Sequence, residues 1–215
     1  MTISEENYLK VIYHLSLVSP KGVNTNAIAG MLDTKASSVT DMLKKLADKD
    51  LVAYKKYQGV TLTENGTLTA KMIVRKHRLW EVFLVEKLNF SWDEVHEIAE
   101  ELEHIKSEKL INKLDAFLNF PAFDPHGDPI PNEKGEIIKL QKQLLSEVAL
   151  NISYKCVGVK DSSPEFLQYL DKQQIALGST FKVIEKESFD DTLLVEINNN
   201  KITISNKIAS NLYVQ

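Results

Sequence analysis

The first 62 residues follow two hydrophobic periodicities whose order is compatible with few folds. Apolar residues recur at helical spacing from Ser4 to Ser19, and shorter helical stretches follow over Asn24–Leu32 and about Lys35–Lys49. Two strand-like runs around a turn with Gly59 then complete the segment Leu51–Leu62. The order helix, helix, hairpin predicts a winged helix-turn-helix, whose recognition helix enters the major groove of DNA.

The rest of the chain divides into a helical block and a β-rich block. The pattern predicts one long helix from Thr63 to about Leu88 and another from Trp92 to about Phe120. A segment over 121–135 holds four of the six prolines and is therefore a loop or linker. Short strand-like stretches follow from about Leu150, with a helical interruption over Ser163–Asp171 and turn residues at 198–200.

These blocks give a mainly α fold with small β parts. We expect three domains: a winged helix-turn-helix DNA-binding domain over 1–74, a helical domain with a proline-rich linker over 75–149, and a C-terminal SH3-like β-barrel over 150–215. No repeat of fixed period interrupts this order. The sequence therefore predicts a multidomain protein.

The composition, with 43% hydrophobic and 26% charged residues, is that of a soluble globular protein. Cys156 is the single cysteine, which excludes an internal disulfide and suits a reducing compartment. No apolar run reaches the roughly 18 residues of a membrane span, and the N-terminal segment lacks the apolar region of a signal peptide. We expect a cytoplasmic protein with no membrane partner.

The charge of the chain is unevenly distributed. The net charge is -4, yet residues 1–75 contain ten Lys and Arg against seven Asp and Glu, a net of +3, so the remainder carries -7. A basic first part suits contact with the phosphates of DNA, because neutralised phosphates supply most of the non-specific affinity.

Histidines and carboxylates gather at helical spacing in the second block. His96, Glu100, Glu103 and His104 share one face of the predicted helix, and His77 and Glu81 share a face of the preceding one. Two helices that each offer a histidine and carboxylates can converge on a cation. Nitrogen and oxygen ligands without a thiolate favour Mn²⁺, Fe²⁺, Co²⁺ or Zn²⁺. The alternative is an amphipathic helix pair joined by salt bridges, and spacing alone leaves both open.

A second group of residues suits contact with DNA. Small hydroxyl residues at the start of the predicted third helix can approach base edges and phosphates, assisted by free N–H groups of the helix N-terminus. Nearby lysines add positive charge, and the hairpin offers a wing that can lie along the DNA backbone. The residues expected to contact DNA are Ser37, Ser38, Thr40, Asp41, Lys44, Lys45, Lys55, Lys56 and Tyr57.

Together these segments resemble the diphtheria toxin repressor and manganese transport regulator family of metal-dependent transcriptional repressors. The resemblance covers essentially the whole chain, and no single segment is specific without the others. It rests on NYLKVIYHL (7–15), ASSVTDMLKKLADKDLV (36–52), RKHRLWE (75–81), EVHEIAEELEHI (94–105) and GDPIP (127–131).

The resemblance implies two metal sites. One takes His77, Glu81 and His96 together with Glu165 and Gln168 from the C-terminal domain, which is FeoA-like in this family. The other, regulatory site takes Glu100, Glu103 and His104 together with Asn7 from the N-terminal helix. The family also implies a homodimer, double-stranded operator DNA as partner and Mn²⁺ or Fe²⁺ as the activating metal, with Co²⁺, Ni²⁺, Zn²⁺ or Cd²⁺ binding in vitro.

Three positions depart from one branch of the family or the other. Glu100 stands where the diphtheria-type branch has a cysteine, and a carboxylate in place of a thiolate favours Mn²⁺ or Fe²⁺. Asn7 stands where the family has Met or Asp, so its amide oxygen is a neutral donor. Lys10 stands where the manganese branch has a glutamate, and an ammonium cannot bind a metal. These departures favour two separated sites over a close binuclear one.

The resemblance therefore implies a metal-activated repressor that controls genes of metal uptake and homeostasis and is not an enzyme. Two alternatives compete with it: a winged-helix regulator that senses no metal, and a His/Glu metalloenzyme. Against the enzyme, the sequence contains no HExxH, nucleophile elbow, P-loop or dinucleotide fingerprint.

Overall fold

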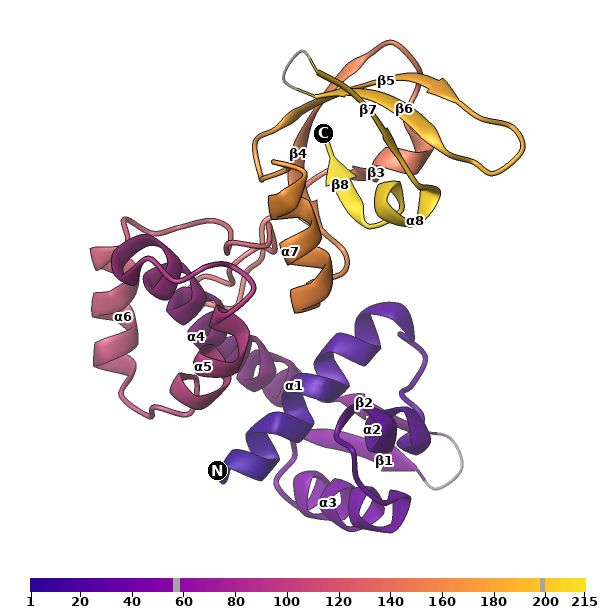
Figure 1. Ribbon diagram of the computed structural model, residues 1–215. Coiled ribbons are helices and arrows are strands. Elements are labelled where there is room, and N and C mark those ends of the chain that lie inside the picture. The colour runs from indigo at the N-terminus through magenta and orange to yellow at the C-terminus, as the bar shows by residue number, and fades with distance from the viewer. Residues whose placement is uncertain (56–58, 198–199) are drawn as a thin grey trace. The chain divides into compact units, whose positions relative to one another are not determined.

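The computed structural model describes residues 1–55, 59–197 and 200–215 (Figure 1). The chain divides into two compact units, each made of separate stretches of sequence. Unit 1 consists of Met1–Trp80, Ala99–Phe117 and Pro131–Ile137. Unit 2 consists of Glu81–Ile98, Leu118–Ile130 and Ile138–Gln215.

The N-terminal part of unit 1 has the predicted winged helix-turn-helix, with three helices followed by a two-stranded hairpin (Figure 1). The elements are α1 (Ile3–Val18), α2 (Thr25–Met31), α3 (Ala36–Asp48), β1 (Val52–Lys55) and β2 (Gly59–Leu62). The predicted contacts Lys56 and Tyr57 lie outside the described residues.

Local signals set the starts of two of these helices. Thr2 caps α1 in a reciprocal capping box with Glu5, whose side chain accepts a hydrogen bond from the Thr2 backbone. The Asn24 side chain accepts from the Asn26 backbone and so caps α2. By contrast, Lys35 provides no side-chain cap for α3.

Apolar side chains from all five elements form one core. Leu9 and Ile12 of α1 are fully buried, as are Ile28, Leu43 and Val60 of the elements that follow. Val23 extends the hairpin by one bridge, since Val23 and Val60 exchange both backbone hydrogen bonds. The apolar faces predicted from helical periodicity are therefore buried, and they pack α1 against the helix-turn-helix.

Three further helices follow the hairpin: α4 (Glu64–Leu88), α5 (Val95–Leu102) and α6 (Glu108–Phe117). The single helix predicted from Trp92 to Phe120 is wrong, because the chain leaves helical geometry after Leu102 and starts again at Glu108. Ser107 accounts for the restart, since its side-chain and backbone oxygens accept from the N–H groups of Leu110 and Ile111. Glu103 and His104 thus lie in the turn after α5. Among the described residues, no helix is both long and apolar enough to cross a membrane.

The proline-rich segment is a loop, as predicted, and it is ordered by its own polar groups. The Asp124 carboxylate accepts from the backbone N–H groups of His126 and Asp128. Gly127 has φ +85°, and its backbone lies against Val157, where a Cβ would meet the carbonyl oxygen at 2.1 Å. The loop therefore holds His126 in a defined place within unit 2.

The C-terminal part of unit 2 is an SH3-like β domain with one six-stranded sheet in the order β3-β8-β4-β5-β6-β7 (Figure 1). Strands β3 and β8 and the short helices η1 and α8 are additional to the predicted elements, and residues 198 and 199 of the predicted turn lie outside the described residues. The elements are β3 (Gln143–Leu144), η1 (Leu145–Glu147), β4 (Ser153–Val159), α7 (Pro164–Lys172), β5 (Thr180–Lys186), β6 (Leu193–Ile197), β7 (Asn200–Ile204), α8 (Asn206–Ala209) and β8 (Leu212–Val214).

Candidate metal centres and DNA-binding helix

A buried cluster of charged groups joins α1 to the end of α5 within unit 1. Lys10 Nζ lies 2.5 Å from Glu100 Oε1 and 2.7 Å from both carboxylate oxygens of Glu103. Glu103 has no exposed surface and Lys10 is 8% exposed. A carboxylate this deeply buried needs compensating charge, and Lys10 provides it.

His77 of α4 completes the same cluster. Its Nδ1 lies 2.7 Å from Glu103 Oε2 and 3.8 Å from Glu100 Oε1. Burial opposes ionisation of Glu103, but the hydrogen bond with His77 and the charge of Lys10 outweigh it and lower the Glu103 pKa. His77, Glu100 and Glu103 each present a ligand atom within 4.8 Å of the others, which is a spacing suited to a cation.

His104 is positioned by a carboxylate on α1. Glu6 Oε2 lies 2.6 Å from His104 Nδ1, while His104 Nε2 lies 3.9 Å from Glu103 Oε1. A carboxylate that accepts from Nδ1–H leaves Nε2 as the free donor for a metal. Two donors that bind one ion at about 2.1 Å each stand at most about 4.2 Å apart, so this pair fits a shared ion.

Asn7 lies between Glu6 and Lys10 on α1. Within the described part of the chain, its Oδ1 is buried and has no hydrogen-bond partner. A buried amide oxygen without a donor is costly, and a cation can satisfy it. The structure therefore brings the predicted residues Glu100, Glu103 and His104 together, and leaves an acceptor on the neighbouring helix.

A second group of ligands lies within unit 2. Glu81 lies on α4, and its Oε1 is 3.7 Å from His96 Nδ1. Its other carboxylate oxygen, Oε2, is 3.7 Å from His126 Nδ1. Glu81, Asp124 and His126 are all buried, and each presents a ligand atom within 4.8 Å of the others. His77 precedes Glu81 by one turn of α4.

His126 is held as a cation in this environment. Burial disfavours its charge, but the Glu81 and Asp124 carboxylates and the Trp92 carbonyl outweigh burial and raise its pKa to about 9. Its Nε2 lies 2.8 Å from the Trp92 backbone oxygen, which leaves Nδ1 directed at Glu81. A divalent ion at this place would have to displace that proton in order to bind Nδ1.

Helix α7 carries Glu165 and Gln168, the two ligands expected from the C-terminal domain. Both side chains are exposed. Gln168 Nε2 donates to Asp93 Oδ2 at 2.8 Å, and Trp92 Nε1 donates to Asp171 at 3.1 Å. These contacts bring α7 to the residues that precede α5, three positions before His96. Glu165 belongs to none of the ligand groups formed by the described residues.

Helix α3 presents six of the residues expected to contact DNA, and Lys55 is exposed at the end of β1. Ser37 and Ser38 are exposed near its N-terminus, and Lys44 makes an exposed ion pair of 3.3 Å with Asp41. Thr40 is half-buried and its hydroxyl donates to the Ala36 carbonyl at 3.0 Å. Exposed pairs of this kind contribute little stability, so the lysine is available to phosphate.

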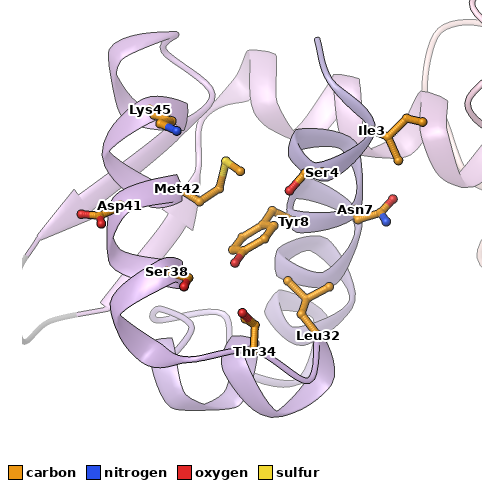
Figure 2. A pocket seen from close by; sticks show the side chains of 10 residues that line it. All are labelled: Ile3, Ser4, Asn7, Tyr8, Leu32, Thr34, Ser38, Asp41, Met42 and Lys45. Carbon is orange, nitrogen blue, oxygen red and sulfur yellow. The ribbon is translucent and has the colours of Figure 1, made fainter.

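A cavity of about 600 Å³ lies between parts of α3 and α1, beside the core that they share (Figure 2). Figure 2 shows Ser38, Asp41 and Lys45 of α3 on one side of it and Asn7 on the α1 side. The helix that carries the metal-cluster residues therefore also borders the face of α3 that is expected to contact DNA.

Three family descriptions match consecutive parts of the chain. They are the iron dependent repressor N-terminal DNA binding domain at residues 1–60, the iron dependent repressor metal binding and dimerisation domain at 63–132, and the FeoA domain at 143–215. The chain is 32% identical over 149 residues to the HTH-type transcriptional regulator MntR of Oceanobacillus iheyensis, covering 69% of this chain and 97% of that protein. The chain belongs to the diphtheria toxin repressor and manganese transport regulator family.

Other members of this family are similar along part or all of the chain. The iron-dependent repressor IdeR of Mycobacterium tuberculosis is 34% identical over 126 residues, which cover 59% of this chain and 54% of that protein. A solved manganese-dependent transcriptional repressor in complex with manganese is 32% identical, with a TM-score of 0.84 over 98% of each chain. The manganese regulator SloR is 34% identical with a TM-score of 0.75.

Membership confirms the predicted function class. The chain is a metal-dependent transcriptional repressor of the diphtheria toxin repressor family and not an enzyme, which removes the metalloenzyme alternative. It contains a DNA-binding domain and a dimerisation domain. The regulator without metal sensing is removed as well, since the matched second domain is a metal-binding one.

Sequence reasoning missed three residues that the structure adds to the clusters of this repressor: Glu6, Asp124 and His126. Glu6 lies in the first turn of α1, and no spacing connects it with His104, 98 positions away. Asp124 and His126 lie in the proline-rich loop, where helical periodicity has no meaning. The sequence signal for this pair is that His126 follows Asp124 by two residues in an irregular segment.

Proposed function

We propose that this repressor binds double-stranded operator DNA as a homodimer when loaded with Mn²⁺ or Fe²⁺, and that it controls genes of metal uptake and homeostasis. It acts in the cytoplasm, where its operator lies. We assign DNA binding to residues 1–74, metal binding and dimerisation to 75–149 and the SH3-like domain to 150–215.

The regulatory site of this proposal consists of Glu100, Glu103, His104 and Asn7. Glu6 fixes the tautomer of His104, so Nε2 faces the buried Glu103 carboxylate. Asn7 Oδ1 is buried and has no hydrogen-bond partner among the described residues, so it suits the role of the ligand from α1. A divalent ion held by these residues would supply positive charge between α1 and the turn after α5.

The second site consists of His77, Glu81 and His96, with Glu165 and Gln168 from α7. Support comes from the approach of His96 to Glu81 and from the contact of Gln168 with Asp93. The buried Asp124 and His126 also face Glu81, and we include them as candidate ligands. These residues hold the proline-rich loop and the end of α4 together.

The ligand types support Mn²⁺ or Fe²⁺. Both groups offer carboxylate oxygen, amide oxygen and imidazole nitrogen, which suit these ions better than soft ones. Cys156 is buried in the core of the SH3-like domain, where burial raises its pKa to about 11 and keeps it a thiol. Relatives of known structure are described as manganese-dependent, and ScaR is described with bound Zn²⁺ and Cd²⁺.

Helix α1 connects the metal cluster to DNA binding. It contributes Glu6, Asn7 and Lys10 to the cluster and borders α3 across the cavity in Figure 2. Fixing α1 against the turn after α5 restricts where α3 stands in each protomer, and dimers bind half-sites only at set spacings. A coupling of about 1–3 kcal/mol changes operator affinity about 5- to 150-fold.

On α3 and the wing, the DNA contacts we propose are those predicted from the sequence. The free amides of the first turn and the exposed hydroxyls suit phosphates and base edges, and the lysines suit phosphates. The residues are Ser37, Ser38, Thr40, Asp41, Lys44, Lys45 and Lys55, with Lys56 and Tyr57 outside the described residues.

The observation that carries the proposal is the buried Glu103 carboxylate facing His104 Nε2. We therefore expect Glu103→Ala or His104→Ala to abolish metal-dependent operator binding. The measurement is retention of genomic DNA fragments by the purified protein at fixed salt, with Mn²⁺ and then with chelator. Glu97→Gln, on the exposed side of α5, is the control. Retention by either variant that still depends on Mn²⁺ would show the regulatory site to be elsewhere.

A further inference from the structure

We infer that Tyr8 is a positioning residue, whose hydroxyl contacts Thr34 and thereby transmits the position of α1 to the start of α3. The inference rests on the proposed function and deepens it, because it names a side chain through which metal binding changes DNA affinity. Three observations carry it: the two sides of α1, the place of Thr34 in the fold and the cavity beside the tyrosine ring.

Helix α1 presents two different sides to the rest of unit 1. On one side, Glu6 Oε2 lies 2.6 Å from His104 Nδ1, and Asn7 is the proposed ligand. Tyr8 follows directly, and one residue turns a helix by about 100°. Figure 2 shows the Asn7 side chain directed away from α3 and the Tyr8 ring directed toward it. A shift of α1 at the metal site therefore moves the Tyr8 ring against the helix-turn-helix.

Thr34 is the residue that the tyrosine hydroxyl meets. The hydroxyl of Tyr8 points toward Thr34 and Ser38 in Figure 2, and all three residues border the same cavity. Burial raises the pKa of Tyr8, and a side-chain hydrogen bond with Thr34 opposes that rise. The contact therefore joins a phenol of α1 to a hydroxyl in the turn between α2 and α3.

Thr34 is well placed to set the position of α3. Its backbone N–H donates to the Ala29 carbonyl oxygen at 3.0 Å, which ties the turn to α2. Thr34 precedes Ala36, the first residue of α3, by two positions. The exposed Ser37 and Ser38, which are proposed DNA contacts, follow directly. A constraint on Thr34 is therefore also a constraint on where the first turn of α3 stands.

The cavity beside Tyr8 explains why the hydroxyl contact decides the position of the ring. Tyr8 is 7% exposed and belongs to the core that α1 shares with the helix-turn-helix. It also borders the cavity of about 600 Å³ on its way to α3, so side chains do not close around it on that side (Figure 2). Protein interiors fix a side chain by close packing, which is incomplete here. The hydroxyl contact supplies the missing constraint.

A second contact holds the other end of α3. Glu5 Oε1 lies 2.7 Å from Lys49 Nζ, and Lys49 is the C-cap of α3. Glu5 and Tyr8 are three residues apart and thus share a side of α1. The Lys49 side chain is exposed, so this ion pair contributes little by itself. Contacts at both ends fix the direction of a helix, and the buried Tyr8 provides the one at the end that carries the DNA-contacting hydroxyls.

The test measures how strongly Mn²⁺ changes DNA affinity. The probe is one genomic DNA fragment that the unmodified full-length chain retains in Mn²⁺. Its affinity is measured by fluorescence anisotropy at fixed salt, with saturating Mn²⁺ and with chelator, and the ratio of the two affinities is the coupling factor. Tyr8→Phe and Thr34→Val each remove one hydroxyl at nearly constant size.

Tyr13→Phe is the matched control. Tyr13 is a buried tyrosine of the same helix and is not among the described residues that line the cavity. The control therefore removes the same atom from α1 without touching the contact with Thr34.

We expect Tyr8→Phe to lower the coupling factor about 2- to 12-fold, the usual range for one hydrogen bond, and to leave the affinity in chelator near that of the unmodified chain. Thr34→Val should give a loss of similar size. The double variant should lose no more than either single one, because both substitutions remove the same contact. Tyr13→Phe should change neither affinity.

Equal losses of affinity with Mn²⁺ and with chelator would overturn the inference, since a contact that only supports the fold acts in both conditions. Losses that add in the double variant would overturn it as well, and so would a coupling factor that Tyr8→Phe leaves unchanged. In each of these results the unmodified chain still depends on Mn²⁺, so the proposed function stands. An unmodified chain whose DNA affinity does not depend on Mn²⁺ would overturn the proposed function itself.

Discussion

Glu6 Oε2 lies 2.6 Å from His104 Nδ1, although 98 residues separate the two in the sequence. The contact joins the first helix of the DNA-binding part to the turn that follows α5. It also fixes which imidazole nitrogen is free, because Nδ1–H donates to the carboxylate and Nε2 is left as the donor to a metal.

We predict that Glu6→Ala lowers Mn²⁺ affinity at the regulatory site about 10- to 100-fold, the usual effect of removing the carboxylate behind a metal-binding histidine. The measurement is a calorimetric titration with Mn²⁺. Glu5→Ala removes the adjacent carboxylate, which pairs with Lys49 instead, and should weaken the helix start while the affinity stays near that of the unmodified chain. Equal losses of affinity in the two variants would show a general effect of charge near α1.

The raised pKa of His126 predicts how the metal-free protein responds to pH. Its folded-state pKa of about 9 lies above the ordinary value of 6.5, so the protonated form stabilises the fold. This contribution is fully present below about pH 6.5 and is lost as the pH rises through about 9. In urea unfolding with chelator, His126→Ala should therefore be clearly destabilising near pH 6 and much less so above about pH 9.5. A difference that does not change with pH would contradict a charged His126.

Local signals explain why the first part of the fold was predictable from sequence. The winged helix-turn-helix could be predicted from apolar residues at helical spacing, such as Leu43 and Leu46, and from two strand-like runs around Gly59. Such signals lie within a few residues of one another. The break after Leu102 was missed because apolar spacing continues through it, and only the Ser107 cap marks the restart.

The candidate site was predictable only where its residues shared a helix. His77 with Glu81, and His96 with Glu100, are four residues apart and were found by spacing. Glu6 meets His104 through tertiary packing, and no sequence period records that contact. The contact of Lys10 with Glu103 was similarly hidden, since sequence shows that a lysine cannot bind a metal but not which carboxylate it contacts.

A third prediction concerns the ion pair between Glu5 and Lys49, which joins the start of α1 to the end of α3 at 2.7 Å. Lys49 and the Thr2 backbone lower the Glu5 pKa, so the pair contributes stability above the ordinary carboxylate range and loses it as the pH falls through the lowered pKa. Lys49→Met should lower the thermal stability of the metal-free protein at neutral pH, and the deficit should shrink below about pH 4. Thermal unfolding across this range checks it, and a deficit that persists in acid would assign the effect to packing.

Gly127 provides the last prediction, because it positions the loop that carries Asp124 and His126. Its φ of +85° disfavours any other residue, and an added Cβ would lie 2.1 Å from the Val157 carbonyl oxygen. We expect Gly127→Ala to destabilise the protein by more than about 2 kcal/mol in urea unfolding and to weaken metal binding in unit 2.

Gly30 of α2 is the matched control, since a Cβ there meets no atom within 4 Å. Gly30→Ala removes a glycine from a helix and should raise stability by about 0.5–1 kcal/mol. The two substitutions are chemically identical, so opposite signs of their effects isolate the backbone conformation at Gly127. If Gly127→Ala were as well tolerated as Gly30→Ala, the loop would not be held against β4 as the backbone contact with Val157 indicates.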